Sequence, residues 1–593
     1  MLWDPRTVDD NLEEVGRDKW LKFGQQIRST RIRDILTRKA TLGVVRRWRQ
    51  LVQQVENVTS GTMEAMETWA QWDEEVLSIL AQVVISQRIV PTDLEDGLAI
   101  YRAIEITSGT TVLGQDDRLA ICDALSELGS HQELLQTVSR LNIADFNHRQ
   151  AGLLTANAFN FESGLDELFW LKSVNTVLGE DELADLVLDP NGQPVLDRLS
   201  CKAVPGSVQG PLVTVIVPTH NPGLEIFTAV RSLVLQTWRN LEILIMDDAS
   251  DPEYESRIQS LENLDPRIRV IHSSPNRGSY YVRNLAVSRY AHGEFVTIHD
   301  DDDWSHADKI AFQVSYLLES GLAADTCHTI RVTNSCRFVR VAEPLVYSRM
   351  SYASLMVRRS VFRSIGYWQP LWTNADREFW LRIESWQGRR IPVLGKTPWL
   401  FQRVRENSLT FNEISRGYIL SSRRWHEWLS VALHSRSQIS GRRVFEGVGV
   451  SSQPSRASYA LQKQLPGTIE PKIDDLVITH WGKENDMIED AIKKVNELRT
   501  LGHVVGLMHV DSPRWGIAAG ITDRVARLVE QEGIHLIAVE DELSVKTAWV
   551  LDPGGCWLAE SPQPKLHAEH VICPCGNGGG QCYLRYQTET IHD

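Results

Sequence analysis

The chain has 593 residues, a formal net charge of −15 and a globular composition in which 42% of the residues are hydrophobic. This length exceeds one core and predicts about three or four domains. The acidic balance argues against a general nucleic-acid binder, which would need surplus Lys and Arg. We expect a cytoplasmic protein, because no apolar run reaches the roughly 20 residues that span a bilayer and no signal-peptide pattern opens the sequence. The eight cysteines are mostly far apart and predict no disulfide framework.

Residues 1–165 are predicted to form an all-α domain. Apolar residues recur there at helical spacing, as from Val76 to Val84, and strand signals are few. Helices are expected to pair, although no repeat period is clean enough to name.

The segment of residues 17–55 is strongly basic, with eleven Lys and Arg residues against two acids. Apolar residues such as Trp20, Phe23 and Trp48 are interleaved with these charges. One interpretation is peripheral contact with an anionic membrane at its inner face, where each basic residue contributes about 1 kcal/mol. The alternative is that the apolar residues pack against the next helix and the charges form a solvated face or a dock for an acidic domain.

Residues 166–210 are predicted to be a transition, followed by an α/β domain over residues 211–430. Its first strands are expected at residues 212–217, 242–246, 268–271 and 295–298, with a helix between the first two. This order predicts βαβ units, in which ligands bind beyond the carboxyl ends of the strands. Those ends carry Thr219, Asp248 and four consecutive aspartates.

The aspartate run, residues 300–303, is the most unusual feature of the sequence. Adjacent carboxylates repel one another, so a cation is expected to bind them and neutralise part of their charge. In an extended backbone Asp300 and Asp302 would share a face, and two carboxylates suit Mg²⁺ or Mn²⁺. The alternative is a solvated acidic turn.

Five motifs in this domain resemble those of family 2 glycosyltransferases with the GT-A fold, in the family's order and spacing over residues 211–415. They are VIVPTHN at residues 215–221, ILIMDDAS at 243–250, NRGSYYVRN at 276–284, the aspartate run, and NADREFWLR at 374–382.

The resemblance implies a nucleotide-sugar donor, with UDP as the expected nucleotide. Asp248 would bind the base and Thr219 would lie beside the same nucleoside. Asn276, Arg283 and Asn284 would line the nucleotide pocket, although a buried structural role for Asn284 is as well supported.

The aspartate run matches the DxD motif of the family. The resemblance places Asp300 near the ribose or the metal, makes Asp302 the direct ligand of Mn²⁺ or Mg²⁺, and includes Asp301 between them in the donor site. Asp303 would support them.

Asp376 occupies the position of the family's catalytic base, which removes a proton from the acceptor hydroxyl. A capping box over residues 373–376 is the structural alternative, and Glu378 is the reserve candidate. Arg405 stands where many members carry a metal-binding His. Because a cation cannot ligate a cation, either Arg405 binds the diphosphate or the metal has fewer protein ligands.

Residues 431–470 are predicted to be a linker, with SSQPS at 451–455 as its clearest part. Residues 471–593 are predicted to form a small Rossmann-like α/β domain, faintly like half of a GT-B glycosyltransferase. Near its end Cys573, Cys575 and Cys582 offer soft ligands for a structural zinc ion, but their spacing matches no common zinc module.

The resemblance therefore predicts an inverting glycosyltransferase that moves a sugar to a hydroxyl of a saccharide or lipid-linked acceptor. Cell-surface polysaccharide, teichoic-acid-like polymer or glycolipid synthesis would be the setting, with no nucleic-acid partner. The alternative is a non-catalytic nucleotide-sugar-binding or scaffolding subunit, favoured only by Ala375 and Arg405. A deacetylase or nuclease would explain neither Asp248 nor the segment at residues 276–284.

Overall fold

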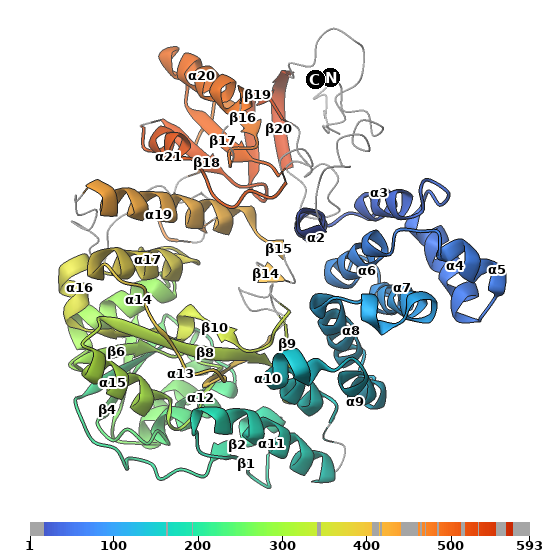
Figure 1. Ribbon diagram of the computed structural model, residues 1–593. Helices are drawn as coiled ribbons and strands as arrows, with labels where there is room; N and C mark the ends of the chain where they lie inside the picture. The colour runs from blue at the N-terminus through green and yellow to red at the C-terminus, as the bar shows by residue number, and fades with distance from the viewer. Residues whose placement is uncertain are drawn as a thin grey trace.

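The protein, seen in a computed structural model, has a helical array, a central α/β part and a smaller C-terminal α/β part (Figure 1). The structure describes residues 17–572 except 160, 162–163, 193, 341–344, 406–413, 416–417, 441–460, 463–464, 469, 483–485, 512–515, 532 and 553–564. Within these residues, no helix has both the length and the apolar character needed to cross a membrane. The proposed linker motif at residues 451–455 and the three cysteines of the suggested zinc site lie outside the described residues.

The N-terminal part is helical, as predicted. Its α-helices are α2 (Arg17–Gln26), α3 (Thr30–Ala40), α4 (Trp48–Thr59), α5 (Met63–Trp69), α6 (Glu74–Gln87), α7 (Asp93–Ser108), α8 (Gln115–Glu127), α9 (His131–Arg140), α10 (Ile143–Asn157) and α11 (Gly164–Leu178). Helix α6 begins after Asp73, whose carboxylate accepts the Val76 N–H, and it is buried over nearly its whole length. A buried bidentate ion pair between Arg33 and Asp93, with both N–O distances 2.6 Å, ties α3 to α7.

The interleaved apolar residues of the basic segment face the helical core. Trp20, Phe23, Ile32, Leu36, Val45 and Trp48 are each at most 5% exposed and belong to one hydrophobic cluster with α6 and α7. Leu42 and Val44 are the large apolar residues of this segment that stay largely exposed. The helix-packing alternative therefore accounts for the apolar half of the pattern.

The central part has an 11-stranded mixed sheet, in agreement with the predicted α/β architecture. Its main strand order is β5-β4-β3-β6-β11-β8-β13-β7, and β9, β10 and β12 also pair with β8. The strands are β3 (Val213–Thr219), β4 (Leu241–Asp248), β5 (Ile268–Ser273), β6 (Phe295–Ile298), β7 (Trp304–Ser305), β8 (Ala324–Val332), β9 (Phe338–Val339), β10 (Arg349–Met350), β11 (Met356–Arg358), β12 (Val393–Leu394) and β13 (Leu400–Arg403). The first four run parallel, whereas β11 is antiparallel to both neighbours.

Helices cover both faces of this sheet, because alternate strand residues point to opposite sides. Val213, Val215 and Val217 of β3 pack with helices on one face, whereas Ile216 packs on the other. The first face carries α12 (Glu225–Val234) and α15 (Lys309–Ser320), and the second carries α14 (Ser279–Leu285), α16 (Ser360–Ile365) and α17 (Ala375–Gln387). Helix α13 (Glu255–Ser260) follows β4 in the chain. The central strands are buried along their length, and this leaves their carboxyl ends for chemistry.

The helical part and the central sheet share one hydrophobic core. Trp170 of α11 stacks on Phe338 of β9, with ring centroids 5.8 Å apart, and Phe338 meets Phe401 of β13 at 5.9 Å. The Asn157 side chain also exchanges two hydrogen bonds of 2.8 Å with the Phe338 backbone. Between these parts, β1 (Leu186–Leu188) and β2 (Leu199–Cys201) form an antiparallel pair. The domain limits expected from the sequence stay predictions.

The C-terminal part is a parallel sheet of order β18-β17-β16-β19-β20. Its elements are β16 (Asp475–Thr479), α20 (Asp486–Thr500), β17 (Val505–His509), α21 (Asp523–Val529), β18 (Ile534–Ile537), β19 (Glu542–Val550) and β20 (Lys565–Ile572), close to the predicted βαβ steps. The long helix α19 (Ser421–Ser440) lies between this sheet and α17 (Figure 1). A short pair, β14 (Ile414–Ser415) and β15 (Tyr418–Ile419), precedes α19.

Candidate active site

Three neighbouring parallel strands bring the predicted polar residues to one edge of the central sheet. Strand β3 ends at Thr219, β4 ends at Asp248, and β6 ends two residues before Asp300. Thr219 donates a hydrogen bond of 2.5 Å to Asp301 across the gap between two of these ends. The carboxyl ends therefore meet as the sequence pattern predicts.

The aspartate run is a turn and not an extended strand. Residues 301 and 302 occupy the turn, so the prediction that Asp300 and Asp302 share one face of an extended backbone is wrong. The acids divide differently: Asp300 pairs with Arg283, Asp301 and Asp302 pair with Arg405, and Asp303 accepts the Arg403 backbone N–H at 3.0 Å. Four carboxylates can lie together at a strand end because arginines and N–H donors offset their desolvation and mutual repulsion.

Arg405 lies directly against residues 300–302, the part of the aspartate run that has the spacing Asp-x-Asp and that we call the DxD segment. Its Nε is 2.6 Å from Asp302 Oδ2, its Nη2 is 3.4 Å from Asp301 Oδ1, and its Nη1 pairs with Glu225 at the start of α12. Burial raises the pKa of Asp301 to about 7, with the carboxylate of Asp302 adding to the rise and Arg405 opposing it. A cation therefore stabilises the carboxylates of Asp301 and Asp302, and in this structure that cation is the Arg405 guanidinium.

Asp376 is the second residue of α17 and does not take part in a capping box. The residue that caps the helix is Asn374, whose side chain makes no capping hydrogen bond. The Asp376 carboxylate accepts the Tyr280 hydroxyl at 2.7 Å and Arg283 Nη1 at 3.2 Å. The same guanidinium reaches Asp300 through Nη2 at 3.2 Å. Arg283 thus joins the predicted base to the first acid of the DxD segment.

Arg283 and Tyr280 form a buried support beneath the two acids. Burial lowers the pKa of Arg283, but the carboxylates of Asp376 and Asp300 outweigh it and the net shift is upward. Burial and the Asp376 charge raise the pKa of Tyr280 well above its usual value, so its hydroxyl keeps its proton and donates it to the hydrogen bond. Tyr280 was not among the site residues predicted from the sequence. Its position three residues before Arg283 on one helix was the available signal, because such residues share a face.

Asp248 organises the loop that leads into α14. Its carboxylate accepts the backbone N–H groups of Arg277 at 3.0 Å and Gly278 at 2.7 Å. Burial raises the pKa of Asp248, and these two donors oppose the rise. The Asn276 side chain accepts the Gly278 N–H at 3.1 Å, and Gly278 adopts φ +84°, a conformation that suits glycine. Asp248, Asn276 and Thr219 therefore belong to one edge of the site.

Two of the residues predicted to act at the site, Asn284 and Glu378, are instead buried in contacts that stabilise the fold. The Asn284 amide is fully buried and exchanges hydrogen bonds of 2.8 and 3.1 Å with the Trp368 backbone, so the structure favours its structural role over contact with a nucleotide. Glu378, the reserve base, is 5% exposed and binds Arg382 and His434. Burial favours its neutral form, but Arg382 and then His434 hold the pKa of Glu378 at about 2. It acts as a brace between α17 and α19.

Asp300 and Asp376 line the same cavity of about 240 Å³. Three arginines also line it, Arg331, Arg349 and Arg423, together with the ring of Tyr352. These residues come from β8, from β10, from the segment between β10 and β11, and from α19, so no local sequence pattern could have grouped them. The cavity can hold a small polar group beside two carboxylates in a cationic setting.

The acids of the DxD segment fit a divalent cation only in part. Carboxylate oxygens suit Mg²⁺ or Mn²⁺, which commonly take one or two such ligands together with substrate phosphates. Among the described residues, however, the single group of three metal-ligating side chains close enough to hold an ion is His480, His509 and Asp511 in the C-terminal sheet. A metal at the DxD segment would therefore depend on Asp302, Asp300 and donor oxygens.

Comparison with known proteins gives matches to the central part of the chain. Residues 214–366 match the model of the glycosyl transferase family 2. A putative teichuronic acid biosynthesis glycosyltransferase, TuaG of Bacillus subtilis, is 31% identical over 141 residues, which are 23% of this chain and 56% of the relative. The Escherichia coli enzyme WfgD, named UDP-Glc:alpha-D-GlcNAc-diphosphoundecaprenol beta-1,3-glucosyltransferase, is 33% identical over 112 residues, which are 19% of this chain and 43% of WfgD. The chain thus spans about half the length of these relatives.

Among solved structures, S. aureus TarS 1–349 in complex with UDP-GlcNAc aligns with 37% of this chain and 66% of that chain. The identity is 21% and the TM-score is 0.31. The family match includes Thr219, Asp248, Asn276, Arg283 and the aspartate run, whereas Asp376 and Arg405 lie beyond its end.

Proposed function

We propose that this chain, which contains a family 2 glycosyltransferase domain of GT-A fold between a helical and a Rossmann-like part, is an inverting glycosyltransferase that uses a nucleotide sugar. The observation that carries the proposal is the single guanidinium of Arg283, which holds both Asp300 and Asp376 at the rim of one cavity. A donor held at Asp300 would thereby lie beside a carboxylate able to accept a proton.

The donor is expected to lie along the carboxyl ends of β4, β3 and β6. The base of UDP would lie against Asp248 and the loop at residues 276–278, with Thr219 beside the nucleoside. The diphosphate would lie near Asp301, Asp302 and Arg405. A divalent cation on Asp302 and Asp300 would neutralise charge that develops on the departing diphosphate. Arg405 is suited to the same task through hydrogen bonds to phosphate oxygens.

The transfer step needs one displacement. Asp376 accepts the proton of the acceptor hydroxyl, the hydroxyl oxygen forms a bond to the anomeric carbon, and the bond from that carbon to the phosphate oxygen breaks. The nucleoside diphosphate leaves with the bonding electron pair, and the configuration at the anomeric carbon inverts. Tyr280 and Arg283 keep the Asp376 carboxylate oriented through their hydrogen bonds.

The setting of the reaction is inferred from the relatives. TuaG is named for teichuronic acid biosynthesis and WfgD for transfer to a diphosphoundecaprenol-linked sugar. We therefore expect a saccharide or lipid-linked acceptor in surface-polymer synthesis at the cytoplasmic side. Peripheral contact with an anionic membrane through residues 17–55 would rest on charge alone, because most of the apolar residues there are buried. Sedimentation with anionic vesicles at 0.1 M and 1 M salt, with neutral vesicles as control, would test that contact.

The proposal is tested by release of the nucleoside diphosphate from a panel of nucleotide sugars, with and without Mn²⁺. The purified full chain should release UDP slowly from one donor without acceptor and faster with it, and Asp302→Ala should abolish the stimulation by Mn²⁺. The alternative of a non-catalytic binder is favoured by the contacts of Arg405 with Asp301 and Asp302, which occupy the DxD acids. Thermal stabilisation by a donor with no release over days would establish that alternative instead.

A further inference from the structure

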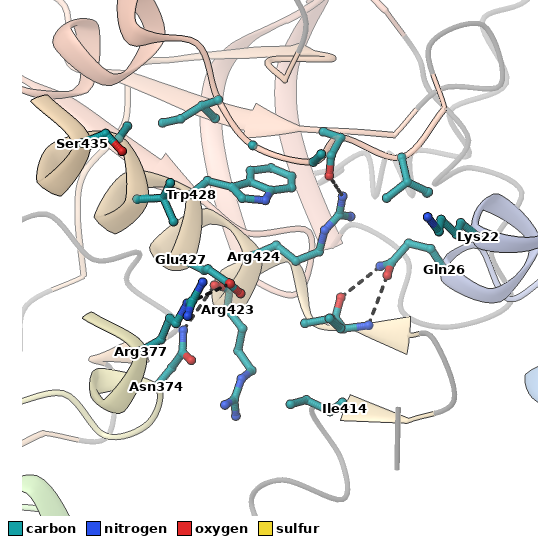
Figure 2. Close-up of a pocket in the computed structure, with 18 of the residues that line it drawn as sticks. Lys22, Gln26, Asn374, Arg377, Ile414, Arg423, Arg424, Glu427, Trp428 and Ser435 are labelled. Carbon is teal, nitrogen blue, oxygen red and sulfur yellow. Dashed lines mark hydrogen bonds and ion pairs between the residues drawn. The ribbon is translucent and has the colours of Figure 1, made fainter. Parts of the chain in front are cut away.

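A cleft of about 1300 Å³ lies between the central and C-terminal parts. Its walls come from α2, α17, α19, α21 and the loop before α21 (Figure 2). Gln26 of α2 closes one end by exchanging hydrogen bonds of 3.0 and 3.1 Å with the Ile419 backbone of β15. The cleft is therefore formed jointly by the helical, central and C-terminal parts of the chain.

This cleft adjoins the cavity at the candidate active site. Arg349, Tyr352, Ile414 and Arg423 line both spaces. Figure 2 shows Arg423 extending away from the pair of Arg377 and Glu427 and toward Ile414. A molecule in the cleft would thus reach Asp376 from the side that faces α19.

The lining of the cleft is cationic, in contrast to the net charge of −15 of the chain. Three carboxylates line it, and two of them pair with lining arginines: Glu427 with Arg377 and Asp523 with Arg527. The six lining cations are Lys22, Arg349, Arg377, Arg423, Arg424 and Arg527, of which Arg424 is paired with the buried carboxylate of Asp511 behind the lining. Positive charge concentrated in a concave surface raises the local concentration of anions.

The size and the rings of the cleft favour an extended occupant. Its volume exceeds the range of about 300–1000 Å³ that is usual for small-molecule sites. Trp428 and Tyr352 present aromatic rings to it, and the Arg424 guanidinium lies over the Trp428 ring, 4.6 Å from its centroid. Such rings suit flat sugar faces, whereas the cations suit phosphate or carboxylate groups.

We propose that the cleft holds an anionic stretch of the acceptor chain, a glycan that carries phosphate or carboxylate groups, while its terminal hydroxyl reaches Asp376. This inference rests on the proposed function for the identity of the bound molecule as acceptor. The binding surface itself is tested without the transfer reaction, so the two proposals can fail separately.

The test uses Lys22 and Arg527, which line the cleft on opposite elements and are exposed. The double variant Lys22→Glu/Arg527→Glu is compared with Lys19→Glu/Arg524→Glu, which makes the same charge change on α2 and α21 at exposed residues that do not line the cleft. Fluorescently labelled octagalacturonate and inorganic polyphosphate are the carboxylate and phosphate probes, and the uncharged methyl ester of octagalacturonate is the neutral control. Thermal unfolding checks that both variants remain folded.

The cleft variant should bind at least one anionic probe about tenfold or more weakly than the wild type, the control variant should stay within about twofold, and 1 M salt should weaken wild-type binding. Equal loss in both variants would overturn the proposal, because it would reflect overall charge. Equal binding of the neutral ester would also overturn it. Sedimentation with anionic vesicles is measured for the same variants, and a cleft variant that loses vesicle binding but keeps binding to both probes would overturn the proposal as well. Hydrolysis of UDP-sugars by the wild type is measured beside these, and its absence would contradict the proposed function alone.

Discussion

The central and C-terminal sheets place polar residues at the same position and use them differently. In the central sheet, Asp300 and Asp376 keep 39% and 24% of their side chains exposed and line a cavity. In the C-terminal sheet, His509 is the last residue of β17 and Asp511 follows two residues later; their side chains are 3% and 4% exposed, and Arg424 pairs with the carboxylate. Parallel strand ends thus gather polar groups in both places, but only the acids of the central sheet keep room for a substrate.

The difference lies in how completely hydrogen bonds are satisfied. Asp511 accepts from both Arg424 nitrogens, from His509 Nε2 at 3.1 Å and from the Ala518 N–H at 2.9 Å. Burial favours its neutral form, but Arg424 and then His509 hold the pKa of Asp511 far below its usual value. The trio of His480, His509 and Asp511 therefore serves as an internal joint between α19 and the C-terminal sheet, because the guanidinium already holds the carboxylate that a metal would need.

Replacing the open carboxylate should give the largest effect. Asp376→Asn removes the proton acceptor while it keeps the size of the side chain, and sugar transfer should fall by about 10²–10⁴-fold. Thermal unfolding should change little. Asp116→Asn is the matched control, because Asp116 is likewise the second residue of a helix and is exposed. A transfer rate for Asp376→Asn equal to that of the control would remove Asp376 from the mechanism.

Replacing the cation of the closed site should reduce stability by about 3–5 kcal/mol. Arg424→Met leaves the Asp511 carboxylate buried without its main partner. Urea unfolding followed by tryptophan fluorescence would measure the loss, since Trp425 and Trp428 contact His509 with ring centroids 5.9 and 5.0 Å away. In Arg424→Met/Asp511→Asn the buried charge is also removed, so the double variant should be less destabilised than Arg424→Met. If it is more destabilised, the ion pair is not the source of the effect.

The closed site should also make the C-terminal sheet sensitive to acid. Burial, and then the neighbouring His509, lower the pKa of His480 to about 3. The unfolded chain therefore binds a proton below about pH 6.5 that the folded chain refuses, and stability falls as the pH drops from 6.5 toward 3. His480 should contribute about 2 kcal/mol to the loss between pH 6.5 and pH 5, and His480→Gln should remove that contribution. Parallel pH profiles for wild type and variant would contradict the assignment.

Removing the cation of the open site should have the smallest effect. Arg405→Ala removes a positive charge that offsets the negative charge of Asp301, Asp302 and the diphosphate. UDP release should therefore fall about tenfold and depend more strongly on Mn²⁺. Arg405→Lys keeps the charge but loses the bidentate geometry, so it should recover part of the rate. An unchanged rate and an unchanged Mn²⁺ response would show that Arg405 acts only as a structural partner of Glu225.

The sequence predicted the strands and the edge at which they end, because buried β-strands and the residues that follow them leave a local pattern. It could not predict the turn at residues 301–302, since a run of four aspartates fits either a turn or an extended end. The bridge by Arg283 depends on α17 returning to the sheet more than 90 residues later. The cationic cleft depends on Lys22, Arg423 and Arg527, which are neighbours only after three parts of the chain have packed together.

The shared core of the helical part and the central sheet has a consequence for synthesis. Asn157 and Phe338 exchange hydrogen bonds although 181 residues separate them. At a translation rate of about 5–20 residues per second, β9 is synthesised about 10–35 s after α10. Until then, the surfaces of α10 and α11 that pack against β9 in the folded protein have no partner. During that interval Trp170 lacks its stacking partner Phe338. We therefore expect the nascent chain to depend on chaperones during this interval, when the helical part is complete and β9 is not. Faster translation would shorten the interval and should raise the yield of folded protein.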